Sequence, residues 1–322
     1  MKAVIMSGVG GPEVLQVAQV PTPVAGPNQV LVRVRAAGVN PIDYKLRKTG
    51  ALGYGAGKIL GFDAAGVVEG VGPGVTDFKV GESVFYSPDF SQQGSYAQFH
   101  VVSQDILAHM PGNLSFEEAA AVPLAGTTAY DGLLTRGQLR IGQTILIAAA
   151  NGGVGSLAVQ IAKAAGAYVF ATASTRSSNF VRSIPVVGPE GHAKGPDRVL
   201  DYQTENWSEM IKAECPAGLD LVYDCAGQDV VSRSIGLLKP FGRIVTVVNP
   251  AGKLDEGYRR NISIEYEFVQ RRRATLETLK TLLERRQIVP LIDSVLPLEQ
   301  AAEAHRQLEA GGVKGKIVLK VE

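Results

Sequence analysis

Three side chains that can donate hydrogen bonds occur close together in one short segment, GVNPIDYK: Asn40, Tyr44 and Lys45. An amide, a phenol and an ammonium group can stabilise negative charge that develops on a substrate oxygen, and the lysine could instead bind a phosphate or a ribose. Asn40 also has a structural explanation, because asparagine followed by Pro41 is a typical helix N-cap with proline at the first helical position. Tyr44 has no such structural explanation, whereas Lys45 could simply be a solvated surface lysine. We treat these three residues as the candidate catalytic groups.

A second segment whose residue types suggest a function runs from Thr144 to Gly155, TILIAAANGGVG. It begins as an apolar stretch of strand length, passes into small residues and continues as a helical pattern. Gly152 and Gly155 hold the last two positions of G-x-G-x-x-G, in which Ala150 replaces the first glycine. Because glycine has no Cβ, a pyrophosphate could approach the backbone here and meet the N–H groups and positive dipole of the helix. A turn that only packs tightly is the alternative, but a second apolar strand at 167–171 favours a dinucleotide site.

The residues after this second strand indicate which dinucleotide would bind. An acid about 20 residues beyond the glycines would accept hydrogen bonds from the ribose hydroxyls and would repel a 2′-phosphate. The chain has no acid in Thr172–Ser178, where Ser174, Thr175 and Arg176 supply two hydroxyls and a guanidinium that can bind a phosphate. These residues predict NADP(H); a solvated polar loop with a stray arginine is the alternative.

Composition excludes several classes of function. The 322 residues suffice for two domains, and 45% hydrophobic residues with a net charge of +1 predict a buried core and no nucleic-acid or membrane partner. No apolar run approaches the ~20 residues of a membrane span, and glycine interrupts the N-terminal MKAVIM too soon for a secretory signal. Cys215 and Cys225 predict no disulfide framework and, with four scattered histidines, no zinc site. We therefore expect a protein of the reducing cytoplasm.

Short strands separated by glycine turns are predicted for the first hundred or so residues. Gln29–Ala37 alternates apolar and polar residues with a period of two, the pattern of a half-buried strand. Ala64–Val71, Ser83–Tyr86 and Tyr96–Val102 are similar. Strands of this length and spacing indicate a compact barrel or a strongly bent sheet.

Strands and helices alternate in the rest of the chain, beginning with a capping-box helix at Ser115 that Pro123 interrupts. Further strands are predicted at Arg198–Asp201, Asp220–Cys225 and Gly242–Val248, which continue a doubly wound sheet, and a late edge strand at Ile262–Phe268. A short helix is predicted at 179–183, and the prolines and glycines of Ile184–Pro196 predict a loop. The last strand, Gly315–Lys320, has no helix after it, which a return to the N-terminal β domain would explain.

Nearly the whole chain resembles the medium-chain dehydrogenase/reductase superfamily, and most closely its zinc-independent quinone oxidoreductase and enone reductase branch. The resemblance rests on GVNPID, on the AAANGGVG turn and on the ending GGVKGKIVLK; the family pattern A-x-x-G-x-x-G is met by Ala149, Gly152 and Gly155. It implies an α/β fold: a doubly wound (Rossmann) parallel-sheet domain plus an N-terminal GroES-like β-barrel domain completed by the C-terminus. We expect the GroES-like catalytic domain at residues 1–123, the Rossmann cofactor-binding domain at 124–268 and the return to the catalytic domain at 269–322.

The resemblance also implies roles for particular residues. It places Tyr202 beside the 2′-phosphate with Ser174, Thr175 and Arg176. Along the cofactor, besides Gly152, it places Lys45, Gly153, Val154, Val248, Asn249, Gly315 and Lys316. Zinc-dependent relatives have a cysteine where this chain has Asn40, a Gly-His-Glu where it has Gly61-Phe62-Asp63, and a four-cysteine lobe that it lacks. These differences imply a metal-free enzyme.

Together these features predict an NADPH-dependent, zinc-independent reductase of quinones or α,β-unsaturated carbonyl compounds. Two alternatives stay open. One is a 2-enoyl-thioester reductase, which would need a dedicated tyrosine donor, for which Tyr44 is the nearest match. The other is a non-catalytic structural or regulatory protein that binds NADPH. The resemblance further implies a homodimer in which the edges at Ile262–Phe268 form one continuous sheet.

Overall fold

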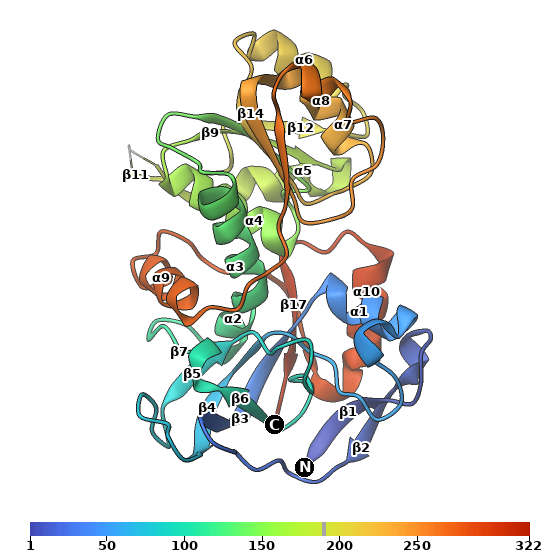
Figure 1. Ribbon diagram of the computed structural model, residues 1–322, viewed down its shortest axis with the longest axis vertical. Coiled ribbons are helices and arrows are strands. Elements are labelled where there is room, and N and C mark those ends of the chain that lie inside the picture. The colour runs from blue at the N-terminus through green and yellow to red at the C-terminus, as the bar shows by residue number, and fades with distance from the viewer. Residues whose placement is uncertain (189–190) are drawn as a thin grey trace. The chain divides into compact units, whose positions relative to one another are not determined.

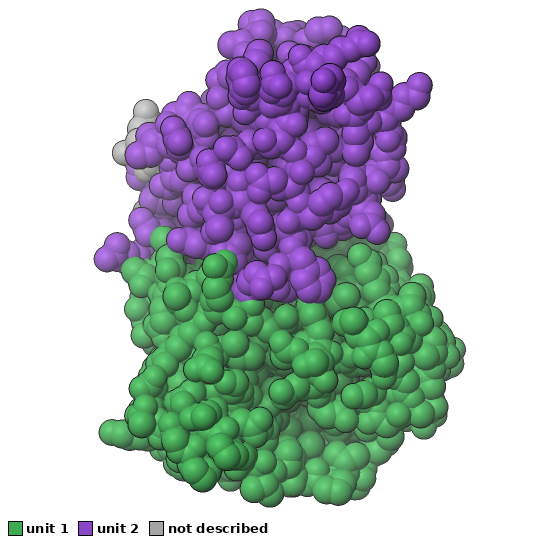
Figure 2. Space-filling view, in the orientation of Figure 1, with its two compact units in different colours: residues 1–124, 271–284, 290–322 green, residues 125–270, 285–289 purple. Residues whose placement is uncertain are grey.

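The computed structural model describes residues 1–188 and 191–322, which form two compact units (Figure 1). The first unit, green in Figure 2, comprises Met1–Leu124, Arg271–Glu284 and Pro290–Glu322. The second unit, purple in Figure 2, comprises Ala125–Gln270 and Arg285–Val289. Segments from the C-terminal part of the chain therefore belong to the unit that the N-terminal residues build.

The second unit is built on a six-stranded parallel sheet with the strand order β12-β9-β8-β13-β14-β15. Counted along the chain, the strands lie in the order three, two, one, four, five, six, so the direction of winding reverses between β8 and β13. This is the doubly wound order of dinucleotide-binding domains, and the predicted fold class of this part of the chain is confirmed. The strands are β8 (Thr144–Ala148), β9 (Tyr168–Ala173), β12 (Arg198–Asp201), β13 (Leu219–Asp224), β14 (Leu238–Thr246) and β15 (Ser263–Tyr266).

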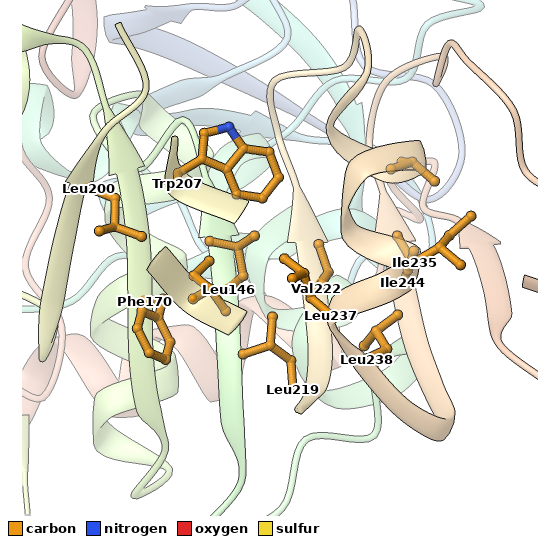
Figure 3. Close-up of a cluster of buried hydrophobic side chains, with 12 residues drawn as sticks. Leu146, Phe170, Leu200, Trp207, Leu219, Val222, Ile235, Leu237, Leu238 and Ile244 are labelled. Carbon is orange, nitrogen blue, oxygen red and sulfur yellow. The ribbon is translucent and has the colours of Figure 1, made fainter. Parts of the chain in front are cut away.

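One face of this sheet carries a row of apolar side chains in register. From β9 to β15 the row consists of Phe170, Leu146, Val222, Ile244 and Ile264. Register partners in adjacent strands project to the same face, so the row makes a continuous apolar surface. Trp207 of α6 (Trp207–Glu214) and Ile235 belong to the same buried cluster (Figure 3). Ile211 and Val231 belong to it as well. Each fully buried side chain of this size contributes about 1.5–3 kcal/mol.

The first unit is organised around β3 (Gln29–Val39), whose burial alternates along QVLVRVR as its period-two pattern predicts. β4 (Ala64–Val71) pairs antiparallel with one edge of β3. On the other edge, β6 (Phe99–Ser103) pairs with residues 29–33, and β17 (Lys316–Lys320) pairs with residues 36–39. The sheet continues through β5 (Ser83–Tyr86) and β7 (Leu107–His109) on one side and β16 (Ile292–Pro297) on the other. The C-terminal strand thus completes the N-terminal sheet, as predicted.

The remaining elements surround these sheets. A separate two-stranded sheet in the first unit consists of β1 (Lys2–Met6) and β2 (Leu15–Gln19). The helices of the first unit are α1 (Pro41–Thr49), α2 (Phe116–Ala120), α9 (Arg273–Glu284) and α10 (Ala301–Ala310). The N-terminal part of the first unit is followed by α3 (Pro123–Tyr130) and by a π-helical stretch, Asp131–Arg136. The second unit also contains α4 (Gly153–Ala164), α5 (Thr175–Ser183), α7 (Val230–Ser234) and α8 (Glu256–Arg259). Within residues 1–188 and 191–322, no helix has both the length and the apolar character needed to cross a bilayer.

The segment Ile184–Pro196 differs from its prediction. The predicted loop is wrong for most of the segment, because Pro185–Gly188 and Gly191–Lys194 form an antiparallel hairpin, β10 and β11. Two adjacent β-branched residues favour extended backbone, and Val186 is only 2% exposed, so burial outweighs the turn propensity of the flanking glycines and prolines. Pro189 and Glu190 lie outside the described residues.

Candidate active site

The glycine turn lies at the carboxyl end of β8, where α4 begins. Gly152 is the N-cap residue, so the N–H groups of Gly153 and Val154 belong to the first helical turn and have no acceptor within the helix. A Cβ on Gly155 would lie 2.3 Å from the carbonyl oxygen of Ala149, so only glycine lets the helix start this close to the strand. The turn therefore combines close packing with backbone donors suited to a phosphate.

The residues predicted to recognise the 2′-phosphate lie at the carboxyl ends of β9 and β12. These strands end in register, so Ser174 and Tyr202, which follow them, occupy neighbouring positions. Ser174 is the N-cap residue of α5, and Thr175 and Arg176 lie in the first turn of that helix. The short helix predicted at 179–183 therefore begins earlier, at Thr175, and the polar residues from Thr175 to Ser178 are helical and do not form a loop.

The side chains at this edge differ in what they already bind. Arg176 is exposed and makes no ion pair or hydrogen bond with the other residues that the structure describes. The hydroxyl of Thr175 donates to Oδ2 of Asp201 at 2.5 Å, and this bond lowers the pKa of the Asp201 carboxyl. Oδ1 of Asp201 accepts the N–H of Gln203 at 3.0 Å. The hydroxyl proton of Thr175 is therefore engaged by Asp201. The guanidinium of Arg176, by contrast, is available to bind a phosphate.

Asp201 is the residue that sequence reasoning missed at this edge. In chain order, Asp201 ends the third strand of the six-stranded sheet. An acid that marks NAD specificity would lie at the end of the second strand instead. The register of β12 against β9 brings Asp201 to the level of Ala173 and so within reach of Thr175. Asp201, the second acid of DRVLDY, was visible in the sequence, but only strand pairing shows which hydroxyl it binds.

The loop after β14 reaches the same edge of the sheet. Oδ2 of the fully buried Asp224 accepts the hydroxyl of Thr246 at 2.9 Å, and Oγ1 of Thr246 accepts the N–H of Val248 at 3.3 Å. These bonds hold Val248 and Asn249 at the carboxyl end of β14. The structure thus brings nine of the predicted residues to one edge of the parallel sheet: Gly152, Gly153, Val154, Ser174, Thr175, Arg176, Tyr202, Val248 and Asn249.

In the first unit, Asn40 is the N-cap residue of α1 and is 2% exposed. Its N–H donates to Oδ2 of Asp43 at 2.6 Å. Two residues far along the chain hold its side chain: Nδ2 donates to Oδ2 of Asp63 at 2.8 Å, and Oδ1 accepts from Nζ of Lys316 at 2.5 Å. The same Nζ lies 2.8 Å from Oδ2 of Asp63. The ammonium of Lys316, predicted to lie along the cofactor, is therefore engaged inside this cluster.

Asp43 is a fully buried acid beside Asn40. Its carboxyl group receives three donors: the N–H of Asn40, the N–H of Gly61 at 3.1 Å and the hydroxyl of Tyr96. Burial outweighs these donors and raises the pKa of Asp43 to about 7. The carboxyl group therefore changes charge near neutral pH.

Tyr96 connects Asp43 to a buried histidine. Oη of Tyr96 lies 3.3 Å from Nε2 of His305, and Nδ1 of His305 lies 3.5 Å from a terminal nitrogen of Arg47. Arg47 in turn pairs with the partly exposed Glu309. Burial and the charge of Arg47 lower the pKa of His305 to about 3. Sequence reasoning missed this polar chain because its members come from separate segments and show no common pattern.

The other candidates of the first unit lie outside this cluster. Lys45 is exposed on α1, and the half-buried ring of Tyr44 has Nζ of Lys48 at 5.6 Å from its centroid. Gly315 has φ +90°, and a Cβ there would lie 2.1 Å from the carbonyl oxygen of Leu291, so the fold alone accounts for that glycine.

Comparison with known proteins agrees with this architecture. The family model of the alcohol dehydrogenase GroES-like domain matches residues 26–127, and that of zinc-binding dehydrogenase matches residues 194–319. A quinone oxidoreductase from Pseudomonas aeruginosa is 33% identical over 99% of this chain and 99% of its own. The chain belongs to the medium-chain dehydrogenase/reductase superfamily.

Other members of the superfamily show the same likeness. An NADPH-dependent alkenal/one oxidoreductase of the Arabidopsis thaliana chloroplast is 32% identical over 99% of this chain and 79% of its own. The solved structure of the quinone oxidoreductase from Coxiella burnetii is 32% identical, with a TM-score of 0.88 over 100% of this chain and 99% of its own. The chain is accordingly an oxidoreductase, and its family implies a nicotinamide cofactor. The glycine turn and the start of α4 have the backbone donors that suit such a group.

The zinc-binding dehydrogenases of the superfamily raise the question whether this chain could hold the metal. At positions where the resemblance places metal-site residues of zinc-dependent relatives, the chain offers oxygen atoms of Asn40 and Asp63, and the ammonium of Lys316 already bonds to both. Phe62 offers no ligand atom in place of the histidine of zinc-dependent relatives. In the described part of the chain, no group of three or more His, Cys, Asp or Glu side chains could hold a metal ion. This donor set does not fit zinc.

Proposed function

We propose that this protein is an NADPH-dependent, zinc-independent reductase of quinones or α,β-unsaturated carbonyl compounds. The substrate class is supported by relatives named quinone oxidoreductase and alkenal/one oxidoreductase, which match nearly the whole chain. The observation that carries the metal-free part is the buried amide of Asn40, bonded to the ammonium of Lys316 where zinc-dependent relatives have a ligand.

NADPH, when bound, supplies the hydride from C4 of its nicotinamide. We propose that the backbone of Gly152, Gly153 and Val154 binds the pyrophosphate, and that Arg176 recognises the 2′-phosphate with Ser174 and Tyr202. The exposed guanidinium of Arg176 supports this assignment, since it has no carboxylate partner among the described residues. Roles along the cofactor for Lys45, Val248, Asn249 and Gly315 rest on the resemblance and remain predictions.

Reduction leaves negative charge on the substrate oxygen, and hydrogen-bond donors must stabilise it where no metal does so. Asn40 donates one Nδ2 hydrogen to Asp63 and has a second that it can offer. The phenol of Tyr44 and the ammonium of Lys45 are the other proposed donors. We assign no general acid, because solvent can protonate a reduced quinone.

We also propose that the protein is a homodimer assembled through β15. Among the residues that the structure describes, β15 is the last strand of its sheet and pairs with β14 on one side only. Tyr266 in this strand and Phe268 beyond it are 58% and 60% exposed. An edge strand flanked by exposed aromatic side chains invites pairing with a two-fold related copy.

The experiment that tests the proposed function is NADPH oxidation against a panel of simple quinones, enones and 2-enoyl thioesters. Turnover of quinones or enones is the expected result. Turnover confined to the thioesters would favour the thioester reductase, with Tyr44 as its donor. Tight NADPH binding without turnover of any of the three classes would favour the non-catalytic alternative.

A further inference from the structure

Lys316 brings a positive charge into the interior of the first unit. It begins β17, its N–H donates to the carbonyl oxygen of Leu291 at 2.9 Å, and the residue is 5% exposed. Its ammonium bonds to Oδ1 of Asn40 at 2.5 Å and to Oδ2 of Asp63 at 2.8 Å. A buried ammonium requires such partners, because leaving water without them would cost several kcal/mol.

The same contacts determine which way the amide of Asn40 faces. Its oxygen meets the ammonium of Lys316, and its nitrogen meets the carboxylate of Asp63. A flipped amide would set its NH2 group against an ammonium and its oxygen against a carboxylate, and both contacts would be repulsive. The carboxylate cannot turn away, since its Oδ1 accepts the N–H of Leu124 at 2.6 Å. One orientation of the amide is therefore strongly favoured.

We propose that Lys316 is a positioning residue for Asn40: it holds the amide in the orientation that leaves one Nδ2 hydrogen for the substrate oxygen. This inference rests on the proposed function, in which Asn40 is a donor. It differs from the role that the resemblance implies for Lys316, since an ammonium bonded to Asn40 and Asp63 is committed to those partners. Lys316 acts through Asn40, so its removal should lower turnover while cofactor affinity stays unchanged.

The test compares Lys316→Met with Lys320→Met, a matched control on the same strand whose ammonium is exposed and lies 3.7 Å from Glu322. We expect Lys316→Met to lower kcat roughly tenfold to a hundredfold and to leave the Kd for NADPH within about twofold. Lys320→Met should change neither quantity. In an Asn40→Ala background, Lys316→Met should cost less than about twofold more, because both changes remove the same donor. A tenfold weaker Kd for NADPH with unchanged kcat, or independent additive losses in the double variant, would overturn the proposal.

Lys316→Met also leaves the charge of Asp63 unpaired, so the variant could lose its fold. The double variant Lys316→Met/Asp63→Asn removes both charges and tests the proposal without that conflict. It should unfold at a temperature close to that of the wild type and still turn over slowly, because Lys316 no longer holds Oδ1 of Asn40 and the introduced NH2 group takes the place of Oδ2 of Asp63, which favours the flipped amide. Recovery of wild-type kcat in this variant would show that the ammonium only neutralises Asp63, and would overturn the proposal.

A readout independent of activity separates this inference from the proposed function. The side-chain amide resonances of Asn40, identified by their loss in Asn40→Ala, should shift in Lys316→Met and stay in place in Lys320→Met. Unshifted resonances in Lys316→Met would overturn the positioning role even in an active enzyme. If the wild type reduces none of the panel, the proposed function fails, while the resonances still decide whether Lys316 orients Asn40.

Discussion

Oη of Tyr96 lies 3.3 Å from Nε2 of His305, and this contact completes a directed chain of hydrogen bonds. Arg47 can only donate, so Nδ1 of His305 must accept from it, and the ring proton belongs on Nε2. That proton is donated to Tyr96, whose own hydroxyl donates to Asp43. This series of hydrogen bonds therefore ends at the buried carboxyl group of Asp43, beside Asn40.

Asp43 and His305 should impose opposite pH dependences on stability. The pKa of Asp43 is about 7 in the folded protein against an ordinary 3.8, so between these values the folded protein keeps a proton that the unfolded chain has lost. The contribution of Asp43 to the free energy of unfolding therefore declines as pH rises from about 4 to 7. The pKa of His305 is about 3 in the folded protein against an ordinary 6.5, so between these values folded His305 stays neutral while the unfolded chain binds a proton. The free energy of unfolding therefore decreases as pH falls from about 6.5 to 3. The two effects oppose each other over most of the same range.

Single substitutions should separate the two contributions. Relative to the wild type, Asp43→Asn should show a free energy of unfolding that rises with pH, and His305→Gln one that falls with pH. Each slope should change by up to about 1.4 kcal/mol per pH unit. Urea unfolding at pH values of about 4.5, 5.5 and 6.5 measures both slopes. Parallel profiles for the wild type and both variants would contradict the assignment.

Arg176→Ala tests the choice of cofactor. Losing a charged phosphate contact costs about 1.5–3 kcal/mol, so the Kd for NADPH should rise roughly tenfold to a hundredfold while that for NADH changes little. Arg182→Ala, at the other end of the same helix, is the control and should leave both affinities near those of the wild type. If NADPH and NADH weaken together in Arg176→Ala, the residue does not read the 2′-phosphate.

Removal of metal ions should leave the enzyme active. The ammonium of Lys316 already bonds to both Asn40 and Asp63, so we expect full activity after exhaustive EDTA treatment and well under one zinc per chain by elemental analysis. A stoichiometric zinc whose removal and return track activity would falsify the metal-free proposal.

Ile264→Pro tests assembly through β15. Proline removes a backbone donor from this short strand and fixes φ, so the variant should shift towards monomer or aggregate. Sedimentation velocity at micromolar concentration should show a dimer for the wild type. A wild-type monomer under these conditions would remove the basis of the prediction.

Lys45→Ala separates cofactor binding from catalysis at an exposed residue of α1. A binding role predicts an NADPH KM that rises several-fold while kcat stays within about an order of magnitude. Lys320→Ala, which removes an exposed lysine of β17, is the control and should change neither quantity. Steady-state kinetics with both substrates varied will distinguish the roles. A thousandfold loss of kcat with unchanged NADPH affinity would make Lys45 a catalytic residue and favour enones over quinones.

Much of the fold follows from local patterns in the sequence. The alternation in Gln29–Ala37 predicts β3, and the apolar run, small residues and helical pattern from Thr144 onwards predict β8, the glycine turn and α4. Such signals are readable because a strand or helix repeats its buried positions at a fixed short interval. The segment Ile184–Pro196 shows the limit, since burial of Val186 decides a hairpin where the local residues predict a loop.

The sequence by itself determined which residue types stand where: a glycine turn, a cation without an acid after the second strand, and Asn40 where zinc-dependent relatives have a cysteine. Only the tertiary structure decided what those side chains bind. Lys316 reaches Asn40 because the C-terminal strand pairs with β3, and Asp201 reaches Thr175 because β12 pairs with β9. Contacts between residues so far apart leave no periodic trace in the chain, since they depend on the register of strands that meet only in the folded protein.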